Sequence, residues 1–178
     1  VGLGQGDDGL GEILVQSGSS LFLTTDSGYQ KIQLSYAPEA ANDSLTVAED
    51  SLATTIAVLT NDFDPDIDQL LITAVGPTAY GGVVSISGDV ISYTPATNFS
   101  GTDIFEYTVS DGSFTDTGFV TVVVNAVNDA PLASDDTLTV MENSQATLIP
   151  VLNNDSDVEN DDFTIIRVGQ TSTGGAVS

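Results

Sequence analysis

The run Gly101-Thr102-Asp103-Ile104-Phe105-Glu106-Tyr107-Thr108-Val109-Ser110-Asp111-Gly112 alternates apolar and polar side chains through its middle. Successive side chains of a strand point to opposite faces, so Phe105, Tyr107 and Val109 share one face. Asp111-Gly112 favours a hairpin turn, and a second alternating run follows it at 117–125. The two runs predict a hairpin with one face in a core. The apolar positions of the second run are Val120, Val122 and Val124.

Short alternating runs of the same kind recur from residue 44 onward, and no helical period interrupts them. Strands are expected at 44–47, 54–59, 69–75, 83–87, 89–94, 103–110 and 117–125. About seven short strands in roughly 100 residues are typical of a sandwich of two sheets. The sequence therefore predicts an all-β sandwich.

Composition excludes several classes of function. The chain of 178 residues carries 26 acidic and two basic side chains, Lys31 and Arg167, for a net charge of −24. Nucleic acids and anionic membranes both require Lys and Arg, so neither is an expected partner. The apolar fraction of 40% in alternating runs argues for a folded chain rather than a disordered one. There is no Cys for disulfides or thiol chemistry.

The sequence shows neither a membrane-spanning run nor a secretion signal. No apolar run approaches the roughly 18 residues of a membrane span, and no secretion signal is present. The first residue is Val1 rather than Met. We expect a processed product, an excised fragment, or the ordered part of a longer protein.

The chain repeats itself at a spacing of 93 residues. Ser44-Leu45-Thr46-Val47 returns as Thr137-Leu138-Thr139-Val140, and Gly81-Gly82-Val83-Val84-Ser85 returns as Gly174-Gly175-Ala176-Val177-Ser178. This period is too long for a solenoid unit and suits a sandwich domain. We expect a complete domain at 41–132, the first half of the next repeat at 133–178, and the closing strands of a preceding sandwich at 1–40, with a glycine-rich lead-in.

Two acidic stretches stand at equivalent places in the two repeats, Asn61 to Asp68 and Asn154 to Asp161. Acidic side chains at alternate positions of an extended segment face one another and repel unless a cation neutralises them. Calcium, which takes six to eight oxygen ligands, is the expected cofactor, and a solvated acidic turn is the alternative. The candidate ligands are Asp62, Asp64, Asp66, Asp68, Asp155, Asp157, Glu159 and Asp161.

Several motifs together carry a family resemblance. They are Asn61-Asp62-x-Asp64-Pro65-Asp66, Tyr93-Thr94-Pro95, Asn98-Phe99-x-Gly101 running on to Asp111-Gly112, and Asn125-Ala126-Val127-Asn128-Asp129-Ala130-Pro131. The pattern resembles the tandem bacterial Ig-like or cadherin-like repeats of large secreted adhesins, and it covers residues 41 to 178. The resemblance implies extracellular Ig-like sandwiches joined end to end and often stiffened by calcium.

The same resemblance implies where further ligands belong. On a cadherin-like topology, Asn128 and Asp129 match linker ligands, and Glu49 and Asp103 approach the same junction from one side. Asp155 and Asp157 approach it from the next repeat. At the opposite end of the complete domain, Asp62, Asp64 and Asp68 are expected to meet Asp111 and Glu39. Glu142, the repeat counterpart of Glu49, completes the set of candidate ligands.

Catalysis finds little support in the sequence. No His is present to activate a serine, and acidic pairs arise by chance among so many acids. An EF-hand is excluded because the sixth loop position holds Ile67 or Asn160 instead of Gly. The strand aromatics are expected in the core rather than on a sugar-stacking platform. They are Tyr93, Phe99, Phe105, Tyr107 and Phe119.

Three functions remain open. The favoured one is a non-enzymatic structural repeat of a bacterial adhesin or filament, secreted or on the cell surface and made rigid by calcium. The alternatives are a carbohydrate- or cell-binding module and an accessory region of a secreted hydrolase. The expected partners are flanking repeats, or other copies of the chain in a head-to-tail polymer in which residues 1–40 of one copy complete residues 133–178 of the next.

Overall fold

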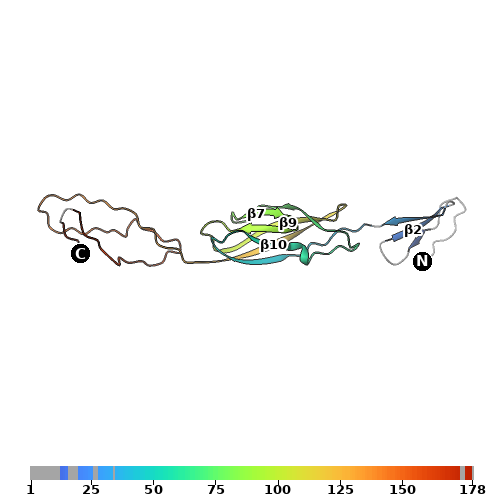
Figure 1. Ribbon diagram of the computed structural model, residues 1–178, viewed down its shortest axis with the longest axis horizontal. Helices are drawn as coiled ribbons and strands as arrows, with labels where there is room; N and C mark the ends of the chain where they lie inside the picture. The colour runs from blue at the N-terminus through green and yellow to red at the C-terminus, as the bar shows by residue number, and fades with distance from the viewer. Residues whose placement is uncertain (1–12, 16–19, 26–27, 34, 173–174, 178) are drawn as a thin grey trace. The chain divides into compact units, whose positions relative to one another are not determined.

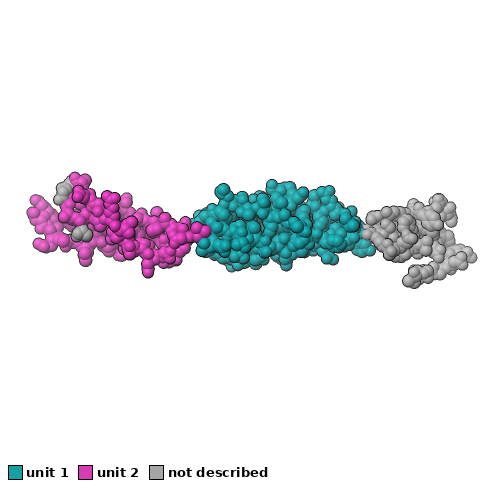
Figure 2. Space-filling view, turned by 60° about the horizontal axis from the view of Figure 1, so that its bottom comes forward, with its two compact units in different colours: residues 1–126 teal, residues 127–178 magenta. Residues whose placement is uncertain are grey.

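A computed structural model describes residues 13–15, 20–25, 28–33, 35–172 and 175–177 (Figure 1). The chain divides into two compact units, residues 1–126 and residues 127–178 (Figure 2). The first unit begins with an antiparallel sheet of order β1-β2-β3, made of Ile13–Val15, Ser20–Thr25 and Gly28–Gln33.

Residues 43–125 form a sandwich of two sheets, which confirms the predicted all-β class. One sheet has the order β4-β10-β9-β6, made of Asp43–Ala48, Thr115–Asn125, Gly101–Ser110 and Leu71–Val75. The other has the order β5-β8-β7, made of Thr54–Ile56, Val90–Thr94 and Val83–Ser87. Strand β4 pairs with β10 in parallel, with Asp43 opposite Val120, and the other pairs are antiparallel.

The strand predicted at 54–59 is shorter than expected. The run 54–59 forms β5 only as far as Ile56, and a 3₁₀ turn, Val58–Thr60, follows. The hydroxyl and the backbone N–H of Thr60 both donate to the carbonyl of Ala57, at 2.8 and 3.2 Å, which closes this turn. Val58 is thereby directed into the core, where it is fully buried.

The core lies between the two sheets and contains the residues that alternation predicted. Its buried apolar members are Val47, Val58, Ile91, Tyr93, Phe105, Tyr107, Val109, Val120, Val122 and Val124. The expectation for Phe119 is wrong, because 47% of its surface is exposed. Val120 points inward, so its neighbour in the strand must point outward. Aromatic character alone therefore did not identify the buried face.

Gly118 makes room for Tyr107, one of the largest buried side chains of this core. A Cβ atom at Gly118 would lie only 2.6–2.8 Å from the outer ring atoms and hydroxyl oxygen of Tyr107, which sits opposite it on β9. Real Cβ atoms do not come so close, so the Tyr107 ring can occupy this place only because residue 118 is a glycine. Gly76 is a useful contrast, because a Cβ there would meet atoms of Glu106 only at ordinary contact distances, of which the shortest is 3.6 Å.

Gly118→Ala should lower the free energy of unfolding by about 1–3 kcal/mol, because Tyr107 would have to leave its place in a close-packed core. Gly76→Ala should change it by no more than about 0.5 kcal/mol. Urea unfolding followed by tyrosine fluorescence measures both. Equal effects of the two substitutions would contradict the packing role of Gly118.

The second unit shows how far local sequence alone shapes the chain. Among its residues 127–172 and 175–177, none lies in a strand, although an isolated bridge joins Leu132 and Ser156. This bridge is the counterpart of the bridge between Glu39 and Phe63 in the first unit. In the first unit the equivalent segments become β4 to β6 by pairing with the later strands β8 to β10.

Across the part of the chain that the structure describes, no helix combines the length and hydropathy needed to cross a lipid bilayer.

Candidate metal centre

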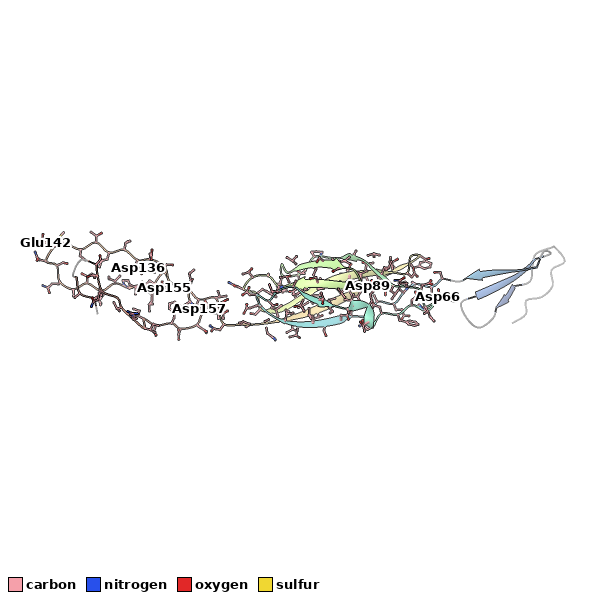
Figure 3. The ribbon with its side chains drawn as sticks, viewed as in Figure 1. Asp66, Asp89, Asp136, Glu142, Asp155 and Asp157 are labelled. Carbon is pink, nitrogen blue, oxygen red and sulfur yellow. The ribbon has the colours of Figure 1, made fainter. Side chains whose placement is uncertain are left out.

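The acidic loop, residues 61–68, connects the 3₁₀ turn to β6 and lies against the lead segment, residues 35–41. Two backbone hydrogen bonds join them: Glu39 N–H donates to the carbonyl of Phe63 at 2.7 Å, and Phe63 N–H donates to the carbonyl of Glu39 at 3.0 Å. Asp66 marks this end of the sandwich, where the lead segment joins it (Figure 3).

Three alternate aspartates of the acidic loop use one carboxylate oxygen each to organise the backbone. Asp62 Oδ1 accepts from Ala41 N–H at 2.8 Å, and Asp66 Oδ2 accepts from Tyr36 N–H at 2.7 Å. Asp64 Oδ1 accepts from the N–H groups of Asp66 and Asp68, at 2.8 and 3.0 Å. The carboxylates thus hold both the loop and the lead segment in place.

The second oxygen of each of these three carboxylates is buried and has no hydrogen-bond partner: Oδ2 of Asp62, Oδ2 of Asp64 and Oδ1 of Asp66. A buried acceptor without a donor costs about 1–3 kcal/mol, and more if it is charged. Such a group is retained only where something offsets that cost. A cation would do so by accepting these lone pairs.

The structure brings three of the predicted ligands together. Asp64, Asp66 and Asp68 each offer an oxygen within 4.8 Å of the others. Asp64 lies deepest, with only 4% of its surface exposed. The donor set is oxygen only, which suits a hard cation such as Ca²⁺ or Mg²⁺. The residues present therefore fit a metal ion of this class.

Ile67, at the tip of the acidic loop, has a strained backbone. Its φ is 65°, in the left-handed region that a β-branched residue rarely adopts, and 89% of its surface is exposed. Asn160 occupies the equivalent place in the second unit with φ of 60°. Because Asn tolerates this conformation, the second repeat carries the better suited residue.

Ile67→Asn should raise the free energy of unfolding by about 1 kcal/mol, since it relieves left-handed strain without removing a buried contact. The same replacement of Ile86, on the extended strand β7, should bring no gain. Thermal unfolding of both variants tests this expectation. A lower melting temperature for Ile67→Asn would contradict it.

Asp43 is a member of this region that sequence reasoning missed. It lies at the start of β4, and its Oδ2 is buried without a hydrogen-bond partner. Burial raises the pKa of the Asp43 carboxyl, hydrogen bonding by Tyr107 partly offsets this rise, and the nearby Asp62 adds to it. Asp136 occupies the equivalent position of the second repeat, and this recurrence could have identified Asp43 as a member of the region from the sequence.

Asp43→Asn should raise the urea midpoint at about pH 7 in chelator and leave it unchanged near pH 3. The raised pKa means that the folded state binds the proton more tightly than the unfolded chain. The ionised carboxyl therefore costs stability at neutral pH, and this cost disappears below the ordinary pKa of 3.8. A shift of equal size at both pH values would contradict the electrostatic cause.

The hydroxyl of Tyr107 joins the acidic loop to the core. It approaches Asp62 Oδ1 at 2.9 Å and the carbonyl of Ala41 at 2.7 Å, while its ring is fully buried. Burial, and then the hydrogen bond to Asp62, raise the pKa of Tyr107, so the hydroxyl keeps its proton. One side chain thereby fixes the lead segment and the first aspartate of the loop against the same core.

Asp111 lies outside the group of three and organises its own turn. The N–H groups of Phe114 and Ser113 both donate to its Oδ1 at 2.6 Å, and they hold the pKa of this carboxyl below its usual value. The predicted hairpin at Asp111-Gly112 is therefore closed by the aspartate itself. Its Oδ2 is buried without a hydrogen-bond partner.

Asp103 and Glu49 are buried, with 0% and 4% of their surfaces exposed. Asp103 Oδ1 accepts from the N–H groups of Tyr80 and Ile104, both at 2.9 Å, and its Oδ2 accepts from the hydroxyl of Tyr93 at 3.0 Å. Burial and this carboxylate raise the pKa of Tyr93. Both carboxylate oxygens of Asp103 thus accept hydrogen bonds within the sandwich.

The second unit reproduces the acidic-loop hydrogen bonds. Asp157 Oδ1 accepts from the N–H groups of Glu159 and Asp161, at 3.1 and 3.0 Å, as Asp64 does in the first unit. Asp155 Oδ1 accepts from Ser134 N–H at 2.8 Å, and Glu159 Oε2 accepts from Asp129 N–H at 3.1 Å. The acidic stretch therefore forms the same hydrogen bonds in both repeats.

Two other predicted ligands lie apart from that loop pattern. The side-chain amide of Asn128 donates to the carbonyl of Asp129 at 2.6 Å, and Glu142 is exposed. Figure 3 labels Glu142 with Asp155 and Asp157. The calcium site expected at the junction would combine Glu49 and Asp103 with residues of the second unit. It involves both units and stays a prediction.

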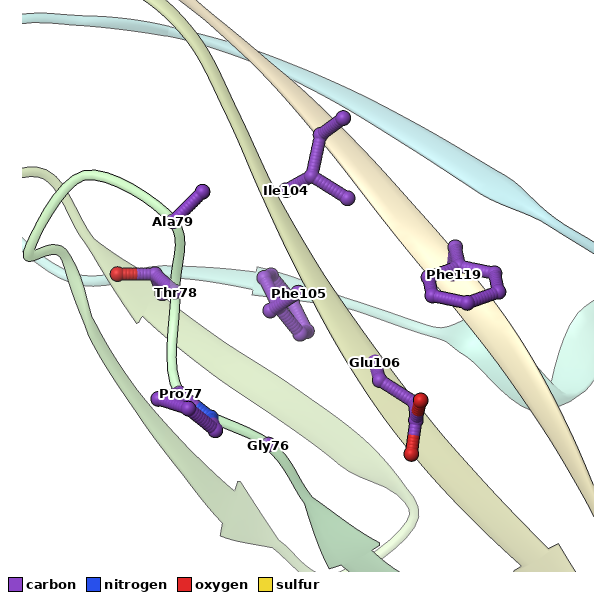
Figure 4. Close-up of a pocket in the computed structure, with 8 residues that line it drawn as sticks. All are labelled: Gly76, Pro77, Thr78, Ala79, Ile104, Phe105, Glu106 and Phe119. Atoms are coloured by element: carbon purple, nitrogen blue, oxygen red, sulfur yellow. The ribbon is translucent and has the colours of Figure 1, made fainter.

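A hollow of about 390 Å³ lies on the outer face of the four-stranded sheet (Figure 4). Ile104 and Phe119, on neighbouring strands, face it beside residues 76–79. Glu106 is the one ionisable side chain among its lining residues. A binding pocket normally combines apolar walls with several convergent polar groups, which this hollow does not offer.

Comparison with known families agrees with the sandwich and its repeat. The family described as bacterial Ig domain matches residues 35–123 and again residues 128–178. The chain belongs to the bacterial Ig domain family. The two matches begin at the lead segment and just after β10, so the bacterial Ig domain includes the lead segment as its first part.

No protein of curated function matches this pair of bacterial Ig domains significantly. Among solved structures, the endo-fucoidan hydrolase MfFcnA4 of glycoside hydrolase family 107 shares 15% identity over 76% of this chain and 26% of its own, with a TM-score of 0.43. Endo-fucoidan hydrolase MfFcnA9 shares 15% identity over 70% of this chain and 27% of its own, with a TM-score of 0.36. The chain thus spans about a quarter of these proteins, and TM-scores this low support no inference about activity.

Proposed function

We propose that this chain is a structural stretch of an extracellular or surface protein of bacteria, built from tandem bacterial Ig domains that bind Ca²⁺ at their acidic loops. Two consecutive family matches and the 93-residue repeat support the tandem array. The strongly acidic composition suits an extracellular setting rich in calcium. In this proposal the chain keeps a defined conformation and does not catalyse a reaction.

The observation that carries the proposal is the buried carboxylate of Asp64. Its Oδ1 accepts two backbone N–H groups and its Oδ2 is buried without a partner. Asp64 also offers one of three carboxylate oxygens that lie within 4.8 Å of one another. A solvated acidic turn would expose its carboxylates to water. Asp64 is 4% exposed instead, which favours an ion over water as its partner.

Calcium is the ion that this donor set suits best. The sequence has no His and no Cys, so soft or borderline metals lack their usual ligands. Mg²⁺ demands a small octahedral shell at about 2.0–2.1 Å, whereas Ca²⁺ accepts six to eight oxygens at about 2.3–2.6 Å in flexible geometry. An irregular loop of neighbouring aspartates meets the second requirement more easily.

Binding would act on the backbone through the carboxylates. Asp66 belongs to the group of three carboxylates, and its Oδ2 accepts from Tyr36 N–H, so an ion that fixes Asp66 also fixes the lead segment. Neutralising the loop removes the repulsion among its alternate carboxylates. We propose that the lead segment becomes a stiff joint when calcium is bound, and that flanking repeats of the same kind are the partners it orients.

Calcium should raise the melting temperature of the full chain by mass action, with about 1.4 kcal/mol gained at ten times the dissociation constant. Asp64→Asn should abolish most of this response, because it removes the deepest carboxylate charge. Asp89→Asn, in the exposed turn between β7 and β8, removes an equal charge and should leave the response intact.

Differential scanning calorimetry in millimolar calcium and in chelator measures all three proteins. An equal calcium response in Asp64→Asn and the parent chain would refute the site. The absence of any response in the parent chain, with no heat of binding by titration calorimetry, would refute the calcium proposal as a whole.

A further inference from the structure

The two acidic loops make the same backbone hydrogen bonds but arrange their carboxylates differently. In the part of the chain that the structure describes, one group of three acidic side chains has oxygens within 4.8 Å of one another, namely Asp64, Asp66 and Asp68. Their repeat counterparts, Asp157, Glu159 and Asp161, do not converge in this way. Of the two loops, the first therefore presents a ready set of ligands and the second does not.

Burial separates the two loops as well. Asp64 is 4% exposed, whereas its counterpart Asp157 is half-buried. In the first loop, Asp62, Asp64 and Asp66 each keep a buried oxygen without a hydrogen-bond partner. Among the described residues, the three counterpart carboxylates of the second loop keep no such oxygen. An ion at the second loop would therefore have to displace water and draw the carboxylates together.

Strands β9 and β10 hold the first loop and the lead segment in place. The hydroxyl of Tyr107, on β9, approaches Asp62 Oδ1 at 2.9 Å. Asp116 Oδ2, on β10, accepts from Ala40 N–H at 2.8 Å. In the second unit, Asp155 Oδ1 accepts from Ser134 N–H, and residues 127–178 include no tyrosine. The first loop is thus fixed by contacts with the sandwich that its counterpart lacks among the described residues.

A site binds its ion more tightly when the ligands are already in place, because less side-chain order has to be created on binding. We infer that the first acidic loop is the tight calcium site of this chain, that the second is at least about tenfold weaker, and that Tyr107 is the positioning residue behind the difference. The inference rests on the proposed function and adds an order of filling to it. At intermediate calcium the lead segment stiffens, whereas its counterpart, residues 128–134, responds at higher calcium.

Titration calorimetry of the full chain with calcium chloride tests the order of filling. The parent chain should show a tight phase followed by a weaker phase. Asp64→Asn should remove the tight phase, because it takes away the buried carboxylate charge. Asp157→Asn makes the same change at the counterpart position and should leave the tight phase intact.

The same titration tests the positioning role of Tyr107. Tyr107→Phe keeps the buried ring and removes the hydroxyl, so it should weaken the tight phase by about tenfold. Tyr93→Phe is the matched control, because it removes another buried tyrosine hydroxyl, one that donates to Asp103 Oδ2 at 3.0 Å. This control should leave the tight phase unchanged, and circular dichroism verifies that both variants are folded before the titration.

Each adverse result points to a different part of the argument. Two phases of equal affinity, or loss of the tight phase in Asp157→Asn, would overturn the order of filling and leave the calcium proposal standing. Equal weakening by Tyr107→Phe and Tyr93→Phe would overturn the positioning role of Tyr107. A parent chain that gives no heat of binding would refute the proposed function, and the inference with it.

Discussion

The fold and the acidic loop both depend on the pair of contacts made by the Tyr107 hydroxyl. The ring fills the centre of the core opposite Gly118, and the hydroxyl meets Asp62 and the carbonyl of Ala41 at the end of the sandwich. A buried hydroxyl needs a partner, and here the partner belongs to the loop rather than to the sheets. The core therefore cannot pack fully unless the lead segment and the loop are in place.

The carboxylates at that end work against the stability that the core provides. Asp43, Asp62, Asp64 and Asp66 each keep a buried oxygen without a hydrogen-bond partner. Desolvation and mutual repulsion both disfavour this arrangement. The loop nevertheless forms twice in the chain, with the same hydrogen bonds around Asp64 and Asp157. The cation that we propose would reconcile these facts, because it would coordinate carboxylate oxygens that have no hydrogen-bond partner in the protein.

Part of the candidate site was predictable because its residues are neighbours in the sequence. Acidic residues at alternate positions of a turn can be recognised from the sequence alone, and Asp64, Asp66 and Asp68 do lie together. Asp43 could not be recognised from its own surroundings, since only the parallel pairing of β4 with β10 brings it to Tyr107 and Asp62. Asp103 makes contacts that the sequence did not predict, because it accepts from the Tyr93 hydroxyl and from Tyr80 N–H in the folded sandwich, while its role as a junction ligand stays a prediction.

Alternation in the sequence determined the strands, their inward faces and the hairpin turns, because side-chain direction along a strand is a local property. The sequence also determined the acidic loop, whose hydrogen bonds arise in the second unit even though no strand surrounds them in its described residues. Tertiary structure alone decided which strands paired across the sheets, where β5 ended and why Phe119 faces outward. It also decided that Asp64 is buried. These outcomes depend on contacts between residues far apart in the chain, which no local pattern encodes.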